Sequence, residues 1–181
     1  MNFYSADPHF DRRNMLSVTK RPFPTVELMN QKILEGYQRR IKDTDDLFLL
    51  GDLVHKSSTA EDAQRWFEQI PGRKHLIIGN HDKTAVTDLP WDSVQNYLEI
   101  EENGRLLVLF HYPMLTWNHA RAGSLHLFGH VHQNWAGSRL AVNVGVDFWD
   151  FAPCTLPEIE VRAASLPPPP HWGVVEPGNG I

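Results

Sequence analysis

The chain of 181 residues has one cysteine, no long apolar run and no excess of positive charge, and each shortage excludes a class of protein. A single thiol, Cys154, excludes an internal disulfide and a thiolate zinc cluster, which fits a reducing compartment. No apolar run approaches the roughly 20 residues that span a bilayer. Lys and Arg number 17 against 22 Asp and Glu, a net charge of -5, so no overall basic field gathers nucleic acid.

Several catalytic motifs are also absent. There is no helical H-E-x-x-H of a zinc peptidase, no G-x-S-x-G elbow of a serine hydrolase and no internal repeat. A strand predicted to begin at Asn2 leaves no room for a signal peptide. The apolar share of 41%, with six Trp and nine Phe, is typical of a globular domain. We therefore expect a cytoplasmic protein without a membrane partner.

The first half of the chain alternates strands with helices. Extended apolar runs are predicted at 2–6, 45–50 and 75–78. A helix capped by Thr25 and another capped by Ser58 or Thr59 separate them. Their apolar residues recur at helical spacing: Val26, Met29, Ile33, Tyr37 and Ile41 in the first, and Ala63, Trp66, Phe67 and Ile70 in the second. This order predicts a parallel sheet covered by helices.

The second half is richer in strands and ends in prolines. Runs at 97–101 and 105–110 flank a turn and predict a hairpin, and 125–128 and 140–146 are further strands. Such strands complete the sheet structure with antiparallel or mixed pairs. We predict a domain over 1–162 and an extended Pro-rich tail over 163–181, outside the core. Trp172 could anchor this tail to its own surface or to a second subunit, so a homodimer is possible.

Metal-ligating residue types follow five of the predicted strands. Ligands in open α/β sheets gather outside the carboxyl ends of strands. Any one of these segments alone reads as a polar loop, but the recurrence predicts a metal site. The five segments are Asp7-Pro8-His9, Gly51-Asp52, Gly79-Asn80-His81-Asp82, His111-Tyr112-Pro113 and Gly129-His130-Val131-His132. Oxygen and imidazole donors without thiolate suit hard divalent ions, and two such ions about 3.5–4 Å apart suit phosphoester hydrolysis.

Taken in order, these five segments resemble the calcineurin-like metallophosphoesterase superfamily. The likeness extends to small bacterial and phage-type members through three further stretches, Ser5 to Phe10, Arg21 to Phe23 and Val144 to Asp147. It implies an α/β fold in which two mixed β-sheets pack as a sandwich flanked by helices, in four layers α/β/β/α. It also implies a dinuclear-metal-dependent phosphoesterase that cleaves phosphodiester or phosphomonoester bonds of small or nucleotide-like substrates through a metal-bridging hydroxide.

The resemblance assigns a role to each residue at the strand exits. Asp7, His9 and His132 would hold one metal, and Asn80, His111 and His130 the other. Asp52 would bridge the two ions. His81 would remain unbound, contact the substrate and protonate the leaving group. Mn, Fe, Zn, Ni and Co all suit these ligands, and Mn is favoured.

One motif departs from the pattern of the superfamily's protein phosphatases, which carry Gly-Asp-x-x-Asp-Arg. Here the run after Gly51 and Asp52 places His55 where the second Asp orients the catalytic His, and Lys56 where the Arg grips phosphate. The departure argues against a phosphoprotein substrate. His55 either contacts the substrate, supplies the proton itself or is a polar loop residue.

Further substrate contacts are expected from two loops. The basic loop 10–24 contributes Arg13 and Asn14, and the loop 116–124 contributes His119, unless either is simply a solvated turn. His126 is expected to be a packed or surface strand residue and not a ligand. For Asp147 we favour a turn, with a hydrogen bond to a ligand His as the alternative.

Two other functions remain open. The basic loop supports a nuclease that acts on nucleic acid ends as an alternative function. The net negative charge of the chain argues against nucleic acid as a partner. A non-catalytic, protein-binding scaffold is known in the superfamily, but such members tend to lose ligands. All seven predicted ligands and His81 are present in this chain.

Overall fold

The first half of the chain builds a parallel sheet. In the computed structural model, which describes residues 1–175, the strands lie in the order β1 (Asn2–Ser5), β2 (Asp46–Leu49), β3 (Arg73–Ile77) and β4 (Ser93–Gln95), and all neighbours are parallel. The first three match the predicted runs. The fourth was not predicted, because its three residues are too few and too polar to show a strand pattern.

Helices cover the outer face of this sheet. They are α1 (Met15–Val18), α2 (Val26–Arg40), α3 (Ala60–Gln69) and α4 (Thr84–Thr87). The Thr25 hydroxyl caps α2 by accepting from the Leu28 amide at 3.3 Å. Thr59, and not Ser58, caps α3 through a reciprocal capping box with Asp62. The predicted helix starts are therefore confirmed.

The second half builds a mixed sheet. Its strands lie in the order β5 (Tyr97–Glu102), β6 (Arg105–Phe110), β7 (Leu125–Phe128), β9 (Ala141–Asn143) and β8 (Gly137–Ser138). The predicted β5–β6 hairpin is antiparallel, whereas β6, β7 and β9 run parallel. Three short 3-10 turns occur in this half: η1 (Ala120–Ala122) and η2 (His132–Asn134) lie between strands, and η3 (Val146–Phe148) follows β9.

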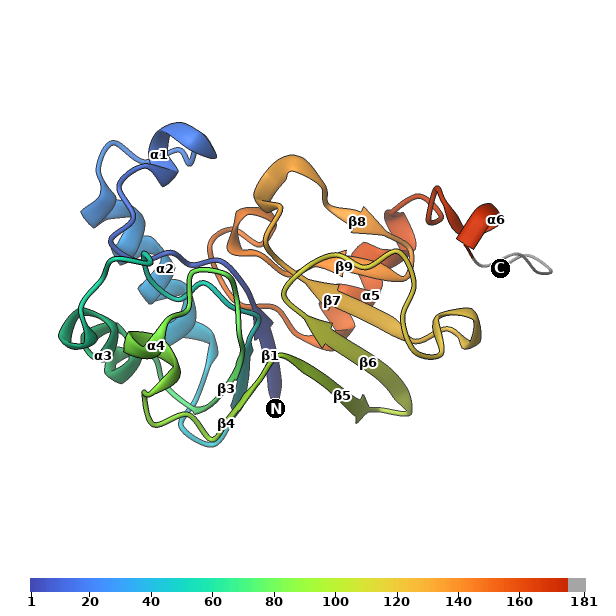
Figure 1. Cartoon of the computed structure of the whole chain (residues 1–181), viewed down its shortest axis with the longest axis horizontal. Helices are drawn as coiled ribbons and strands as arrows, with labels where there is room; N and C mark the ends of the chain where they lie inside the picture. Colours follow the sequence, from blue (N-terminus) through green and yellow to red (C-terminus); the bar gives the residue numbers. More distant parts are fainter. Residues whose placement is uncertain (176–181) are drawn as a thin grey trace.

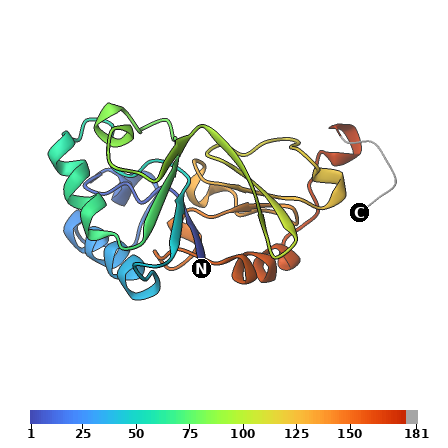
Figure 2. The same cartoon turned by 90° about the horizontal axis from the view of Figure 1, so that it is seen from below.

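The two sheets pack face to face, with helices outside them (Figures 1 and 2). Adjacent residues of β1 point to opposite sides: Phe3 joins the core under α2 and α3, and Tyr4 joins the core shared with the second sheet. The helix α5 (Leu156–Ser165) packs against β9 and β1. The predicted sandwich of two sheets flanked by helices is confirmed, with a first sheet that is purely parallel.

The described residues after position 162 are not the free, extended tail that the sequence predicted. The predicted boundary after residue 162 falls inside α5, where Ala163 is buried. Beyond it, Trp172 at the start of α6 (Trp172–Val175) is 8% exposed, with its ring centroid 5.6 Å from that of Trp117. The other residues assigned to the tail, 176–181, lie outside the described part. That the residues after Ser165 can be deleted without loss of folding or turnover stays a prediction. Within residues 1–175, no helix is both long and apolar enough to cross a bilayer.

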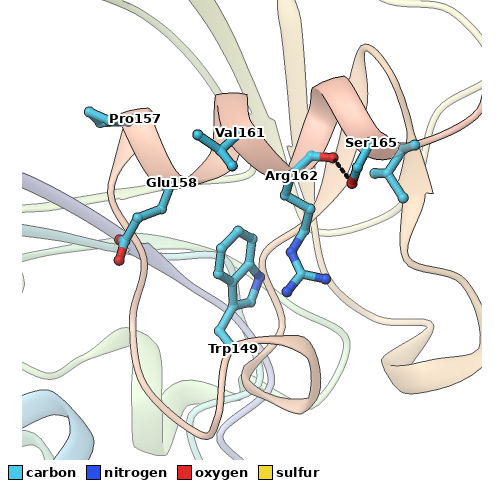
Figure 3. A pocket seen from close by; sticks show the side chains of 7 residues that line it. Trp149, Pro157, Glu158, Val161, Arg162 and Ser165 are labelled. Atoms are coloured by element: carbon cyan, nitrogen blue, oxygen red, sulfur yellow. Dashed lines mark hydrogen bonds between the residues drawn. The ribbon is translucent and has the colours of Figure 1, made fainter.

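A hollow of about 660 Å³ lies beside α5 (Figure 3). The guanidinium of Arg162 lies over the Trp149 ring, 4.2 Å from its centroid, and donates to the Phe148 carbonyl at 2.6 Å. The contact fixes η3 to α5. None of the predicted site residues lines this hollow.

Candidate metal centre

The predicted ligands meet where the carboxyl ends of strands from both sheets come together. Asp7, Asp52 and Asn80 follow β1, β2 and β3 of the first sheet. His111 follows β6, and His130 and His132 follow β7, of the second sheet. Residues that lie as far apart as 123 positions in sequence are thus in contact, as the hydrogen bond from the His130 amide to Asp7 shows.

One group of donors surrounds Asp7. Ligand atoms of Asp7, His9 and His132 all lie within 4.8 Å of one another. His9 Nε2 is 3.8 Å from Asp7 Oδ1 and 3.4 Å from Asp52 Oδ2. This is the trio that the resemblance assigns to the first metal, and its spacing can hold an ion.

A second group surrounds Asn80. Its Oδ1 lies 3.1 Å from His111 Nε2 and 2.9 Å from His130 Nδ1. Asp52 Oδ2 is 3.7 Å from the same His111 nitrogen. Asp52 therefore faces both groups through one carboxylate oxygen, while its Oδ1 accepts from the His81 amide at 2.8 Å.

Two of the imidazoles are oriented by hydrogen bonds on their other nitrogen. His111 Nδ1 donates to the Leu50 carbonyl at 2.7 Å, and His132 Nδ1 donates to Asp147 Oδ2 at 3.2 Å. Each bond leaves Nε2 as a lone-pair donor directed at the cluster. This is the arrangement in which histidines bind metals.

The carboxylate of Asp7 tests whether a cation fits. Asp7 is fully buried, and its Oδ2 accepts from the His130 amide at 2.7 Å, whereas Oδ1 has no hydrogen-bond partner among residues 1–175. Burial raises the pKa of Asp7 to about 7. A buried carboxylate oxygen without a partner is costly unless a cation meets it. The residues present therefore fit a bound divalent ion.

The backbone at the cluster is unusual. Five of the candidate ligands, namely Asp7, His9, Asp52, His130 and His132, have φ between 48° and 68°. The left-handed region is uncommon for side chains other than glycine and costs on the order of 1 kcal/mol or more per residue. Strain of this kind concentrates at functional sites, where it aims side chains at a shared point.

Two glycines allow the strand exits to approach each other. A Cβ added to Gly79 would collide with the Asp52 carboxylate, and one added to Gly129 would collide with Asp7. These positions explain why Gly precedes Asn80 and His130 in the two motifs.

Three polar side chains support the cluster, and only for Asp147 did the sequence offer this role, as the alternative to a turn. Asp82 is buried and accepts from the amides of Asp52, Leu53 and Gly79 at 2.8–3.1 Å, which ties the exits of β2 and β3 together. Asp147 does not serve merely as a turn, because it accepts from both His132 and Arg21.

Arg21 belongs to this support and not to the solvent. Its side chain is fully buried, pairs with Asp147 at 2.8 Å and donates to the carbonyls of Asp7 and Pro8. Part of the basic loop is thereby neutralised inside the protein. The only signal in the sequence was the resemblance of the Arg21 to Phe23 stretch to family members.

His81 lies beside the cluster. Its Nε2 is 3.9 Å from Asp52 Oδ2 and 3.1 Å from Arg12 Nη1, and its Nδ1 is buried without a partner among residues 1–175. Burial, with a smaller contribution from Arg12, lowers the pKa of His81. His55 is the next imidazole, with its ring centroid 6.3 Å from that of His81 and its Nδ1 2.6 Å from Ser57 Oγ. Both positions remain open to a substrate.

The other predicted substrate contacts lie further out. Arg13 is 82% exposed, and its nearest ion-pair partner is Glu27 at 4.0 Å. Asn14 Oδ1 accepts from Arg12 Nε at 3.0 Å. His119 begins η1 near Glu99 of β5, and none of its contacts among the described residues reaches the cluster. Contacts from these three residues to a substrate stay a prediction.

Arg12 lies in the basic loop that the sequence singled out, but Arg13 and Asn14 were predicted as its substrate contacts. The amide of Arg12 bonds to the His9 carbonyl at 3.1 Å, which closes a turn and returns its side chain toward the His9 ring. An i to i+3 turn after His9 is the signal that would have selected Arg12 over Arg13.

His126 is confirmed as a packed strand residue. It is fully buried in β7, where its Nδ1 donates to the Val108 carbonyl at 3.0 Å and its Nε2 accepts from the Met114 amide at 3.2 Å. The second bond holds the segment that follows His111.

A two-sheet α/β sandwich with carboxylates and imidazoles gathered at its edge is typical of a class of metal-binding proteins. The profile of the calcineurin-like phosphoesterase family matches residues 6–119, and the chain belongs to this family. The family binds divalent metals, and the Asp and His groups described above could hold them.

Three similar proteins illustrate the relationship. An uncharacterized protein of Methanocaldococcus jannaschii is 28% identical over 158 residues, covering 83% of this chain and 84% of the relative. The gene 66 protein of Mycobacterium phage D29 is 26% identical over 149 residues, covering 65% of this chain and 74% of that protein. The crystal structure of a protein of unknown function from Aquifex aeolicus superposes with a TM-score of 0.71 at 26% identity, covering 90% of this chain and 98% of that one.

Proposed function

We propose that the protein is a dinuclear-metal phosphoesterase that hydrolyses phosphomonoester or phosphodiester bonds of small or nucleotide-like substrates, with Mn as the favoured metal. One observation carries the proposal. The side chains from two sheets leave Asp7 Oδ1 unpartnered and direct the Nε2 atoms of His111 and His132 at one small region. Oxygen and imidazole donors without thiolate suit Mn, Fe, Zn, Ni or Co.

The ligand roles follow from the two groups of donors. Asp7, His9 and His132 would hold one ion, Asn80, His111 and His130 the other, and Asp52 would lie between them, because its Oδ2 faces His9 and His111. When bound, paired divalent ions activate a water molecule and neutralise charge on the attacking and leaving oxygens.

His81 would serve the leaving group. It is held next to the cluster by the bond from its amide to Asp52, and its own ring nitrogens bind none of the candidate ligands. Burial lowers the pKa of His81, which favours the neutral imidazole in the free protein. A bound phosphate brings negative charge beside it, which raises its pKa and makes it a proton donor.

The alternatives receive less support. A nuclease would use the basic loop, yet Arg21 of that loop is buried against Asp147. A non-catalytic scaffold would not need five strained ligand backbones or an unpartnered buried carboxylate. A cytoplasmic location and a homodimer remain predictions.

The test is turnover of p-nitrophenyl phosphate and bis-(p-nitrophenyl) phosphate by protein stripped with a chelator and reloaded with each metal in turn. We expect activity only after reloading, with a metal content near two ions per chain. Asp52→Asn is the matched control, because it keeps the side-chain shape but removes the charge between the two groups. It should lose both metal and turnover, and unchanged turnover in this variant would refute the bridging role.

A further inference from the structure

Arg12 places a guanidinium on the rim of the metal centre. Its side chain is half-buried, and Nη1 lies 3.1 Å from His81 Nε2 and 3.2 Å from His9 Nε2. Its Nε donates to Asn14 Oδ1 at 3.0 Å, which fixes the direction of the side chain. The guanidinium therefore reaches the space between the first group of donors and His81.

No carboxylate of the described residues lies within ion-pair distance of this cation. Among residues 1–175, Arg21, Arg40 and Arg73 each pair with a carboxylate at 2.5–2.8 Å, whereas Arg12 forms no ion pair and its Nη2 has no partner. Its neighbours are imidazoles and an amide. Burial lowers the pKa of Arg12, and the carboxylates of Asp52 and Asp7, which lie beyond ion-pair distance, act against this shift. A partly buried guanidinium without an ion-pair partner can form charge-assisted hydrogen bonds with an anionic oxygen.

Two cations of the chain act on His81, namely Arg12 and Lys56. Lys56 is exposed and acts on His81 only through its field. Arg12, from the loop after β1, supplies the planar fork that a lysine cannot, and it does so in contact with the substrate-facing His81.

We propose that Arg12 grips a terminal phosphate oxygen and biases the site toward phosphomonoesters. The inference rests on the proposed function. A monoester dianion carries three terminal oxygens that share two negative charges, and a diester carries two that share one. A guanidinium beside His81 gains more from the monoester, because charge-assisted bonds strengthen with the charge on the acceptor. Arg12 therefore favours substrates that end in a free phosphate group.

The test compares Arg12→Ala and Arg12→Lys with wild type on p-nitrophenyl phosphate and bis-(p-nitrophenyl) phosphate, all loaded with the same metal. Arg12→Ala should lower kcat/KM for the monoester by roughly 10- to 100-fold, the loss expected for one charge-assisted contact, and for the diester by less than about threefold. Arg12→Lys should recover only part of the loss, since it keeps the charge but not the fork. Arg39→Ala, which removes an exposed charge at the end of α2, is the matched control and should match wild type on both substrates.

Two further measurements make the result independent of turnover. Calorimetric titration with inorganic phosphate should show affinity weakened by roughly tenfold or more in Arg12→Ala, and metal content should equal that of wild type. Equal losses on both substrates, unchanged phosphate affinity, or a gain of metal in Arg12→Ala would each overturn the proposal. If wild type hydrolyses neither ester, the proposed function fails, and the phosphate titration still decides whether Arg12 binds the anion.

Discussion

At the scale of single residues, the site is a set of histidines in different environments. His9 and His111 are fully buried, His81 and His132 are about 15% exposed on their side chains, and His126 lies in the core away from the donors. The residue type alone does not distinguish a candidate metal ligand from a candidate proton donor or from a core residue. These roles differ in the burial of each ring and in the contacts of its nitrogens.

His81 offers the sharpest test of that separation. Because the His81 ring forms no hydrogen bond to a candidate ligand and its Nε2 is 3.9 Å from Asp52 Oδ2, His81→Ala should keep both metals and lose turnover by roughly 10²–10⁴-fold, the usual contribution of a general acid. Metal analysis and kcat on the same preparation check this. An emptied metal site in His81→Ala would instead make His81 a ligand.

Much of the cluster was predictable because the strand exits carry a local signature. An apolar strand followed by Gly-Asp or Gly-Asn-His is readable in the sequence, and the recurrence of such exits predicted the convergence of Asp7, Asp52, Asn80 and His130. Arg12 was not predictable in this way, since a choice between two adjacent arginines depends on the turn after His9. The Arg21–Asp147 pair spans 126 positions, which one sequence without contact information does not reveal.

At the scale of elements, the short turn η3 links α5 to the site. Arg162 of α5 bonds to the Phe148 carbonyl and covers Trp149, and η3 in turn presents Asp147 to His132 and Arg21. The helix was itself missed from sequence. Its signal was present, with Thr155 three residues before Glu158 and a buried stripe of Leu156, Ile159 and Ala163, but the prolines that follow favoured an extended tail.

Removing the carboxylate of Asp147 should weaken both stability and metal binding. Asp147→Ala leaves Arg21 buried without its counterion, a change that costs about 3–5 kcal/mol in other proteins. It also frees the His132 ring, which should lower metal affinity by roughly 10- to 100-fold. Urea unfolding of the chelated protein and metal titration of the folded protein measure the two effects separately. Unaltered metal affinity would mean that His132 is held by its backbone alone.

The buried His126 of β7 predicts how stability depends on pH. Burial lowers the pKa of His126 to about 4, against 6.5 for the free side chain, so the unfolded chain binds the extra proton between these values. Stability is therefore fully present above about pH 6.5 and is lost as the pH falls toward 4, by about 3 kcal/mol for this one group.

Urea unfolding at pH 7 and pH 4 in the presence of a chelator measures this change. The variant His126→Gln cannot take up the proton, so its stability should fall by about 3 kcal/mol less than that of wild type over the same range. Parallel losses in both proteins would show that the fold does not shift the pKa of His126.

At the scale of the whole molecule, the C-terminal segment closes over the second sheet. The Pro167 carbonyl accepts from the Arg139 amide at 2.9 Å, His171 contacts the Leu115 carbonyl at 2.9 Å, and Trp172 packs on Trp117. The sequence placed this segment outside the core because its composition is rich in proline. The proline content of this segment predicts an extended backbone, but it does not predict that Trp172 packs on the second sheet.

Trp172→Ala should therefore lower the free energy of unfolding by about 2 kcal/mol, the value of burying a large apolar side chain. Because the metal centre lies at the strand exits and not at this end of the sheet, kcat should stay within about twofold of wild type. Thermal unfolding and turnover at 25 °C provide the comparison. Loss of activity without loss of stability would contradict this separation, and a concentration-dependent change in molecular mass would assign Trp172 to a subunit contact.

The donors of each group are drawn from both sheets, and this has a consequence for the life of the protein. Any ion held by them adds a link between two halves that already share an apolar core and polar contacts such as the Arg21–Asp147 ion pair. At a free concentration 100 times its dissociation constant, such an ion adds about 2.7 kcal/mol to the folded state. A cell starved of the metal would then contain a looser sandwich that proteases open more often, so metal supply would govern how much of this protein survives as well as how fast it works.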